Sequence, residues 1–181
     1  MINESITANS FISNYTHRDL VCMEFDKFYN KEKPSGILVD VGCRGTELKQ
    51  YFTDKKFKWI GVDRVGDSEV NQGLMESMPF PNEFADVLFV CHAFEHCEYP
   101  IKALQEFKRV LKPNGYLFIA TPSPCEHQIL KGDDDHIFVL HPMQMIRLLK
   151  YSGWEDGTSY IQSKDIPKEQ DYNVITIARK K

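Results

Sequence analysis

No apolar run in this sequence approaches the roughly 20 residues that a membrane-spanning helix needs. The first residues, MINESITANSF, contain no basic region followed by an apolar block, so the sequence predicts no secretory signal. The five cysteines are odd in number and irregularly spaced, and they form neither a disulfide framework nor paired C-x-x-C zinc motifs. These absences predict a protein of the reducing cytoplasm with no membrane partner.

An excess of positive charge is absent as well. Lysine and arginine number 22 against 26 aspartate and glutamate residues, which gives a net charge of −4. Because proteins that bind nucleic acids usually carry a basic field, the composition argues against a nucleic-acid partner. The length of 181 residues and the hydrophobic fraction of 42% predict one folded domain, residues 1–181, with a single sizeable core.

Apolar strands alternate with amphipathic helices after a polar, helical N-terminal segment, residues 1–36. Continuous apolar runs indicate strands buried on both faces of a parallel sheet, and apolar residues three and four apart indicate helices. Only a polar loop separates the last two strands, so these are expected to pair antiparallel. The sequence thus predicts an α/β fold, a mostly parallel sheet with helices on both faces and an antiparallel hairpin at its end. Strands are expected at 36–42, 57–65, 85–93, 116–122, 157–162 and 173–180, and helices at 17–29, 46–52, 99–115 and 141–154.

Two aspartates stand at the carboxyl ends of the first two predicted strands, where a parallel sheet binds its ligands. Asp40 comes just before the turn GCRG, in which Gly42 can adopt a positive φ and let a ligand approach the backbone. A carboxylate at the buried end of a strand is costly unless it is paired or hydrogen-bonded. Asp63, 23 positions later, can accept both hydrogen bonds of a ribose diol, although an exposed strand-end aspartate would give the same pattern.

With the segments GLMESMPFPNEFADVLFVCHAFEHC and LKPNGYLFIATP, this arrangement resembles the class I S-adenosylmethionine-dependent methyltransferases. The nearest group is that of small methyltransferase-domain proteins related to ubiquinone and sugar methylases. The order and spacing of the motifs match over residues 37–154. The resemblance implies a Rossmann-like, seven-stranded, mostly parallel sheet with a C-terminal antiparallel hairpin, and it implies S-adenosylmethionine as the cofactor.

The resemblance also assigns roles to individual residues. Asp40, Gly42 and the adjoining Cys43 would lie near the methionine part of the cofactor, and Asp63 would hold the ribose hydroxyls. The other cofactor-binding residues would be Arg64, Met75 and Glu76 at the adenine, and Cys91 and His92 at the sulfonium side.

The glycine turn departs from the family pattern D-x-G-x-G-x-G. Arg44 and Thr46 stand at the second and third glycine positions. If the turn requires a left-handed φ at Arg44, the side chain costs roughly 1–2 kcal/mol, which a well-determined site can tolerate. A nicotinamide dinucleotide is disfavoured, because GCRGTE cannot supply the fingerprint G-x-G-x-x-G.

An Asp-His pair follows the strand YLFIATP, where the resemblance places the acceptor. His136 is therefore the candidate catalytic residue, as a general base or acceptor-orienting group, and a histidine that only braces the loop is the open alternative. Glu95 and His96 match the family's E-H pair and are expected to be structural. The aspartate run with His136 and His141 matches no strong metal-ligand signature, so no metal is expected.

The expected function is methyl transfer from S-adenosylmethionine to a small-molecule or sugar-like acceptor. The alternative is a catalytically inactive binding or regulatory protein of the same fold, which the altered glycine turn favours somewhat. Calorimetric titration with S-adenosylmethionine and S-adenosylhomocysteine separates the two.

Overall fold

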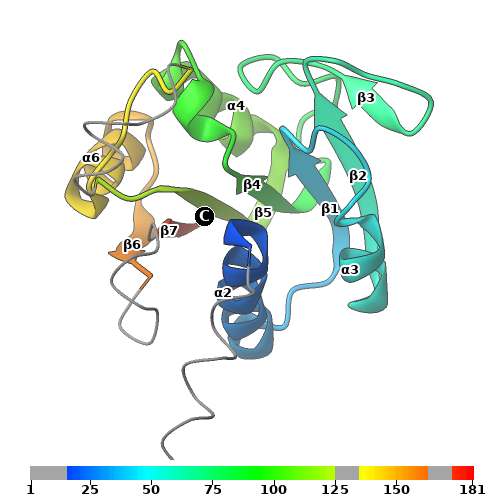
Figure 1. The fold of residues 1–181 in the computed structure, drawn as a ribbon. Helices are drawn as coiled ribbons and strands as arrows, with labels where there is room; N and C mark the ends of the chain where they lie inside the picture. Colours follow the sequence, from blue (N-terminus) through cyan, green and yellow to red (C-terminus); the bar gives the residue numbers. More distant parts are fainter. Residues whose placement is uncertain (1–15, 125–134, 163–172) are drawn as a thin grey trace, which may run out of the picture.

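The fold is a single seven-stranded sheet with helices packed on both faces (Figure 1). This computed structural model describes residues 16–124, 135–162 and 173–181. The strand order is β3-β2-β1-β4-β5-β7-β6, in which β7 runs antiparallel to both of its neighbours and every other pair is parallel. The strands are β1 Gly36–Val41, β2 Phe57–Asp63, β3 Val70–Gln72, β4 Ala85–Cys91, β5 Leu111–Pro122, β6 Asp156–Ile161 and β7 Asn173–Arg179. The predicted α/β, Rossmann-like architecture with an antiparallel end is confirmed.

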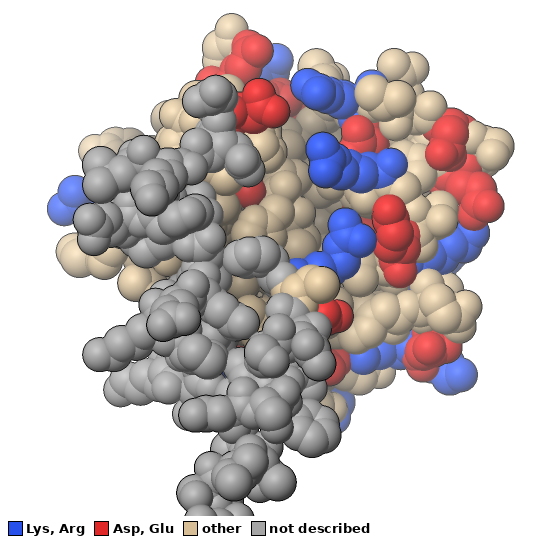
Figure 2. Space-filling model, viewed as in Figure 1, with Lys and Arg blue, Asp and Glu red and all other residues tan. Residues whose placement is uncertain are grey.

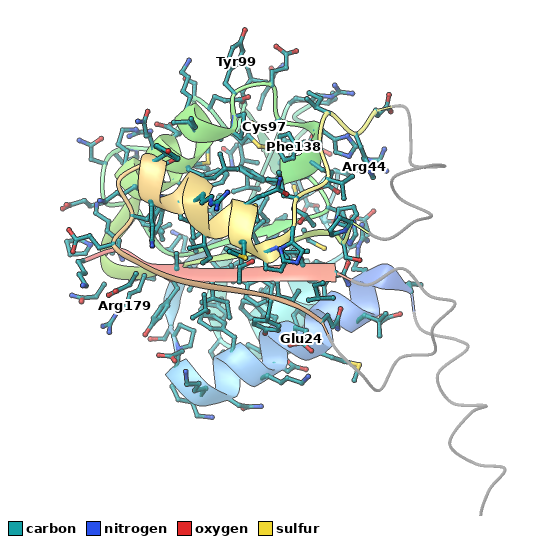
Figure 3. All side chains as sticks on the ribbon, turned by 90° about the vertical axis from the view of Figure 1, so that its left-hand side faces the viewer. Glu24, Arg44, Cys97, Tyr99, Phe138 and Arg179 are labelled. Atoms are coloured by element: carbon teal, nitrogen blue, oxygen red, sulfur yellow. The ribbon has the colours of Figure 1, made fainter. Side chains whose placement is uncertain are left out.

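Alternate residues of the central strands enter two separate cores. In β4, Leu88 and Val90 join the core under α4 (Pro100–Val110) and α6 (Pro142–Tyr151). Their neighbour Phe89 joins the opposite core, under α2 (His17–Glu32) and α3 (Lys49–Asp54). Figure 3 shows the sheet nearly edge-on, with α6 on one side and α2 on the other. Because both faces are covered, the strands read as continuous apolar runs instead of alternating ones.

Helix ends follow local chemistry. Thr16 caps α2 through a capping box, in which its Oγ1 accepts from the Asp19 amide and its own amide donates to the Asp19 carboxylate. Pro142 occupies the first turn of α6, and Gly153, with φ +83°, follows its end, as the sequence predicts. Within the described ranges, no helix is both long and apolar enough to cross a membrane.

Several elements differ from the sequence-based expectation in their bounds or in being unexpected. The helix expected at 99–115 ends at Val110, since Leu111 already pairs with Ala85 and an irregularity then shifts the register of β5. The helix expected at 46–52 begins only at Lys49. β3 was not expected from the apolar pattern, because it has three residues and only Val70 among them is buried.

The parallel strands deliver several connecting turns to one edge of the sheet. A Cβ at Gly42, in the turn after β1, would lie 2.4 Å from the Cβ of Ala93, in the turn after β4. The short 3-10 helix η1, Phe94–His96, follows directly and carries the E-H pair. This edge is therefore where the predicted site residues can meet.

Candidate functional site

Asp40 lies buried at the carboxyl end of β1, with 3% of its surface exposed. Its Oδ2 accepts a hydrogen bond from the indole Nε1 of Trp59 at 3.2 Å. Burial raises the pKa of Asp40 to about 7, although the Trp59 hydrogen bond opposes that rise. A carboxyl group in this position is poised to accept a cation, because a neighbouring positive charge would compensate the lost hydration.

The turn after β1 does require a left-handed backbone at Arg44. Arg44 adopts φ +58° and Gly42 φ +72°, both in the left-handed region. The amide of Gly42 donates to the carbonyl of Val62 in β2 at 2.8 Å, and the amide of Arg44 donates to Asp63 Oδ2 at 2.9 Å. The left-handed conformation of Arg44 thus points its N–H toward Asp63 on the neighbouring strand, so the strained backbone connects the two strand ends.

Asp63 is half-buried at the end of β2, and each of its oxygens accepts one backbone amide. Its second contact is Oδ1 with the amide of Val65, at 3.2 Å. A carboxylate can accept about four hydrogen bonds, so both oxygens retain capacity for a diol. Arg64 beside it is exposed, and its carbonyl accepts from the Gln72 side chain.

The segment after β3 contacts Cys97, the residue directly after η1, through a side chain. Cys97 Sγ donates to Glu76 Oε1 at 3.1 Å, and burial raises the pKa of the Cys97 thiol to about 12, so it stays a donor. Met75, half-buried, packs against the core on the α4/α6 side. In Figure 3, Cys97 and Phe138 lie on the α6 side of the sheet. The Phe138 ring packs against the ring of Phe94 in η1, with their centroids 5.6 Å apart.

The two predicted cofactor-site cysteines are neutral thiols. Burial raises the pKa of Cys43 to about 12 and that of Cys91 well above its usual range. Cys43 Sγ lies only 2.9 Å from the position of a Cβ on Gly61, and its side chain belongs to the α2/α3 core. Only the backbone of Cys43 is therefore suited to a ligand at this edge.

His92 stands at the tip of β4 in a left-handed conformation, φ +48°. A chain of amides fixes its tautomer. Gln162 Nε2 donates to the Leu20 carbonyl, so Gln162 Oε1 accepts from Asn173 Nδ2 and Asn173 Oδ1 must accept from His92. His92 Nε2 therefore carries the hydrogen, and its Nδ1 lies 3.5 Å from Glu95 Oε1.

His136 meets the E-H pair, a contact that the sequence did not predict. Its Nε2 lies 4.0 Å from Glu95 Oε1, and its ring packs edge-on against His96 with centroids 4.9 Å apart. The backbone secures this contact, since Ile137 donates to the Glu95 carbonyl and His96 Nδ1 lies 3.0 Å from the Asp135 carbonyl. Asp135 thus contacts His96 through its backbone carbonyl.

The predicted residues thus fall into two groups at one sheet edge. Asp40, Gly42 and Asp63 surround the β1 and β2 ends, whereas His92 and His136 meet around Glu95. Sequence reasoning missed Trp59 and Asn173 as partners of Asp40 and His92, and it missed Glu95 as the centre of the histidines. Glu95 and His136 are 41 positions apart, and no local pattern signals their contact.

Comparison with known proteins agrees with this geometry. Residues 39–119 match the family model described as "Methyltransferase domain". YcgJ, an uncharacterised methyltransferase of Bacillus subtilis, is 29% identical over 119 residues, which are 66% of this chain and 44% of that protein. UbiE of Pseudoalteromonas translucida, a ubiquinone/menaquinone biosynthesis C-methyltransferase, is 34% identical over 79 residues, 43% of this chain and 32% of UbiE. The chain therefore spans less than half the length of these two relatives.

A solved structure of an S-adenosylmethionine-dependent methyltransferase from Archaeoglobus fulgidus superposes with a TM-score of 0.68. It covers 90% of this chain and 94% of its own, at 19% sequence identity, and so shows the shared fold. The matched region 39–119 contains both strand-end acids and the E-H pair. Sheet order, the matched methyltransferase domain and the relatives together support a class I S-adenosylmethionine-dependent methyltransferase, with S-adenosylmethionine as the cofactor.

Proposed function

We propose that this protein transfers a methyl group from S-adenosylmethionine to a small-molecule or sugar-like acceptor. The observation that carries the proposal is the pair of acids at the ends of β1 and β2, of which Asp40 accepts from the Trp59 indole and Asp63 accepts from the Arg44 amide. One acid is buried and the other is half-buried with capacity for a diol. This spacing suits a ligand with a cationic end and a ribose, and S-adenosylmethionine has both.

Asp40 is proposed to face the methionine ammonium group. Its carboxyl, with a pKa raised to about 7 by burial, ionises more readily when a cation lies beside it. Binding at this position would therefore combine an ion pair with relief of the burial cost. Gly42 and the Cys43 backbone complete this end, Asp63 takes the ribose, and Arg64, Met75 and Glu76 border the adenine.

At the methyl-transfer end, the protein mainly aligns donor and acceptor and keeps water out. Methyl transfer is an in-line displacement in which the acceptor–carbon bond forms, the sulfur–carbon bond breaks and the sulfonium becomes a neutral thioether. Cys91, a neutral thiol, and His92, held by Asn173, are proposed to border the sulfonium. His136 is proposed as the acceptor-side group that orients the acceptor and assists the loss of its proton.

The first test is Asp63→Ala in a calorimetric titration with S-adenosylhomocysteine and S-adenosylmethionine. Lost hydrogen bonds to a charged acceptor are worth roughly 1.5–3 kcal/mol each, so affinity should fall at least about tenfold. Asp54→Ala is the matched control, because Asp54 is an exposed aspartate on α3 that contacts Gln50. Circular dichroism and thermal melts verify that both variants fold.

Each outcome of this titration is decisive. An affinity of Asp63→Ala equal to that of the parent would remove the ribose assignment. If the parent binds neither ligand, the methyltransferase proposal fails and the alternative of an inactive binding or regulatory protein stands.

A further inference from the structure

Three metal-binding side chains converge at the sheet edge, from two segments that follow β4 and β5. Glu95 and His96 belong to η1, and His136 belongs to the loop before α6. Each offers one ligand atom, and these atoms all lie within 4.8 Å of one another. Ligand atoms around a tetrahedral ion at bond lengths of about 2.0–2.2 Å lie about 3.3–3.6 Å apart, so side-chain shifts of up to about 1 Å each would bring all three to one ion.

Glu95 gives an independent reason to place a cation there. Its side chain is 1% exposed, and neither carboxylate oxygen accepts a hydrogen bond from any residue within the described ranges. A buried carboxylate without donors is costly, and compensation comes from a paired charge or a coordinated metal. The groups facing its Oε1 are two imidazoles, His92 Nδ1 at 3.5 Å and His136 Nε2 at 4.0 Å.

The surroundings orient the imidazoles as metal sites require. A carbonyl oxygen only accepts, so His96 Nδ1 donates to Asp135 O and its Nε2 carries the lone pair. His92 is fixed in the same way, because its Nε2 donates to Asn173 and its Nδ1 faces Glu95. A metal-bound histidine commonly donates its second ring N–H to a carbonyl or carboxylate, which fixes the tautomer and the ring.

We infer that Glu95, His96 and His136 bind a divalent transition-metal ion such as Zn²⁺, with His92 beside it. Imidazole and carboxylate ligands suit Zn²⁺ and its neighbours in the first transition row, whereas Mg²⁺ prefers oxygen ligands alone. Three protein ligands leave coordination positions open. Under the proposed function, those positions would take an oxygen atom of the acceptor, and the bound ion would then assist the loss of its proton in place of a free His136 imidazole. The inferred acceptor class is therefore a hydroxyl-bearing small molecule. Metal binding here would overturn the expectation from sequence that no metal binds.

Metal binding can be measured on the protein without any acceptor. The purified chain, stripped with a chelator, is titrated with Zn²⁺ and with Co²⁺, whose visible absorption reports coordination, and Mg²⁺ is titrated for comparison. We expect one Zn²⁺ per chain and at least a tenfold loss of affinity in His136→Gln and in Glu95→Gln. His141→Asn is the matched control, since it removes another histidine of the same loop while asparagine still caps α6.

Thermal stability separates metal binding from a folding defect. Glu95→Gln removes a buried charge and should be at least as stable as the metal-free parent, but it should lose the rise in melting temperature that Zn²⁺ gives the parent. Equal Zn²⁺ affinity in the parent and the Glu95 and His136 variants would overturn the inference, as would the absence of binding in the parent. Titration with S-adenosylhomocysteine is run in parallel. Its failure with Zn²⁺ binding intact rejects only the proposed function, and the reverse result rejects only the metal site.

Discussion

The protonation of the Asp40 carboxyl depends on whether a cation lies beside it. Without a cation beside it, the buried carboxyl favours its protonated form, with a pKa of about 7 caused by burial. Trp59 supplies one hydrogen bond to Oδ2. The residue that the sequence marks only as a strand-end acid is thus also a source of pH-dependent stability.

Asp40→Asn should flatten the dependence of stability on pH. A folded pKa raised above the unfolded value of about 4 gives stability that is complete below pH 4 and is lost as the pH rises through 7. That contribution is at most about 4 kcal/mol, at about 1.4 kcal/mol per pKa unit. Urea denaturation from pH 4 to 8.5 measures it, with Asp54→Asn as the exposed control. A variant that loses stability with rising pH as steeply as the parent would disprove the assignment to Asp40.

Arg44→Gly tests the strain in the turn after β1. A left-handed φ of +58° costs a non-glycine residue roughly 1–2 kcal/mol, and glycine removes that cost while it adds unfolded-state entropy. The backbone contact with Asp63 needs no side chain. We expect stability to rise by up to about 1 kcal/mol and affinity for S-adenosylhomocysteine to stay equal or improve. A collapse of affinity would show instead that the guanidinium contacts the ligand.

At the scale of elements, the turn after β1 packs closely against the turn after β4. Gly42→Ala would place a Cβ 2.4 Å from Ala93 and force alanine to φ +72°. The two costs together should lower the free energy of unfolding by about 2–4 kcal/mol. The double variant Gly42→Ala/Ala93→Gly should recover part of the loss, because it relieves the contact and leaves the φ cost. Chemical denaturation of the parent, the single variant and the double variant measures this recovery. If the double variant is no more stable than Gly42→Ala, the contact with Ala93 does not contribute to the loss.

Sequence patterns predicted the elements where burial is strong and continuous. β1, β2, β4, β5 and β7 are apolar runs because both faces of the sheet are covered. β3 escaped prediction because its pairing with β2, and not its composition, makes it a strand. The end of α4 was misplaced for a similar reason, since the pairing of Leu111 with Ala85 overrides helical periodicity.

At the scale of the whole molecule, the site residues divide by how far apart their partners lie in the sequence. Asp40 and Asp63 were predicted because each ends its own strand, and parallel strands place such ends together. Contacts between distant segments, His136 with Glu95 and His92 with Asn173, arise from the strand order and have no local signal. On the face shown in Figure 2, acidic and basic side chains intermix outside the grey region.

The position of β7 has a consequence for synthesis on the ribosome. Residues 173–179 are translated after every other described strand, yet they lie between β5 and β6. Until they emerge, β5 keeps an open edge and β6 has no strand to pair with, since its pairing is with β7. Nascent chains in which residues 173–179 have not yet emerged therefore expose aggregation-prone strand edges. Chaperones protect such edges. Limited proteolysis of ribosome-bound chains should show protection of the sheet only once Arg179 has left the exit tunnel.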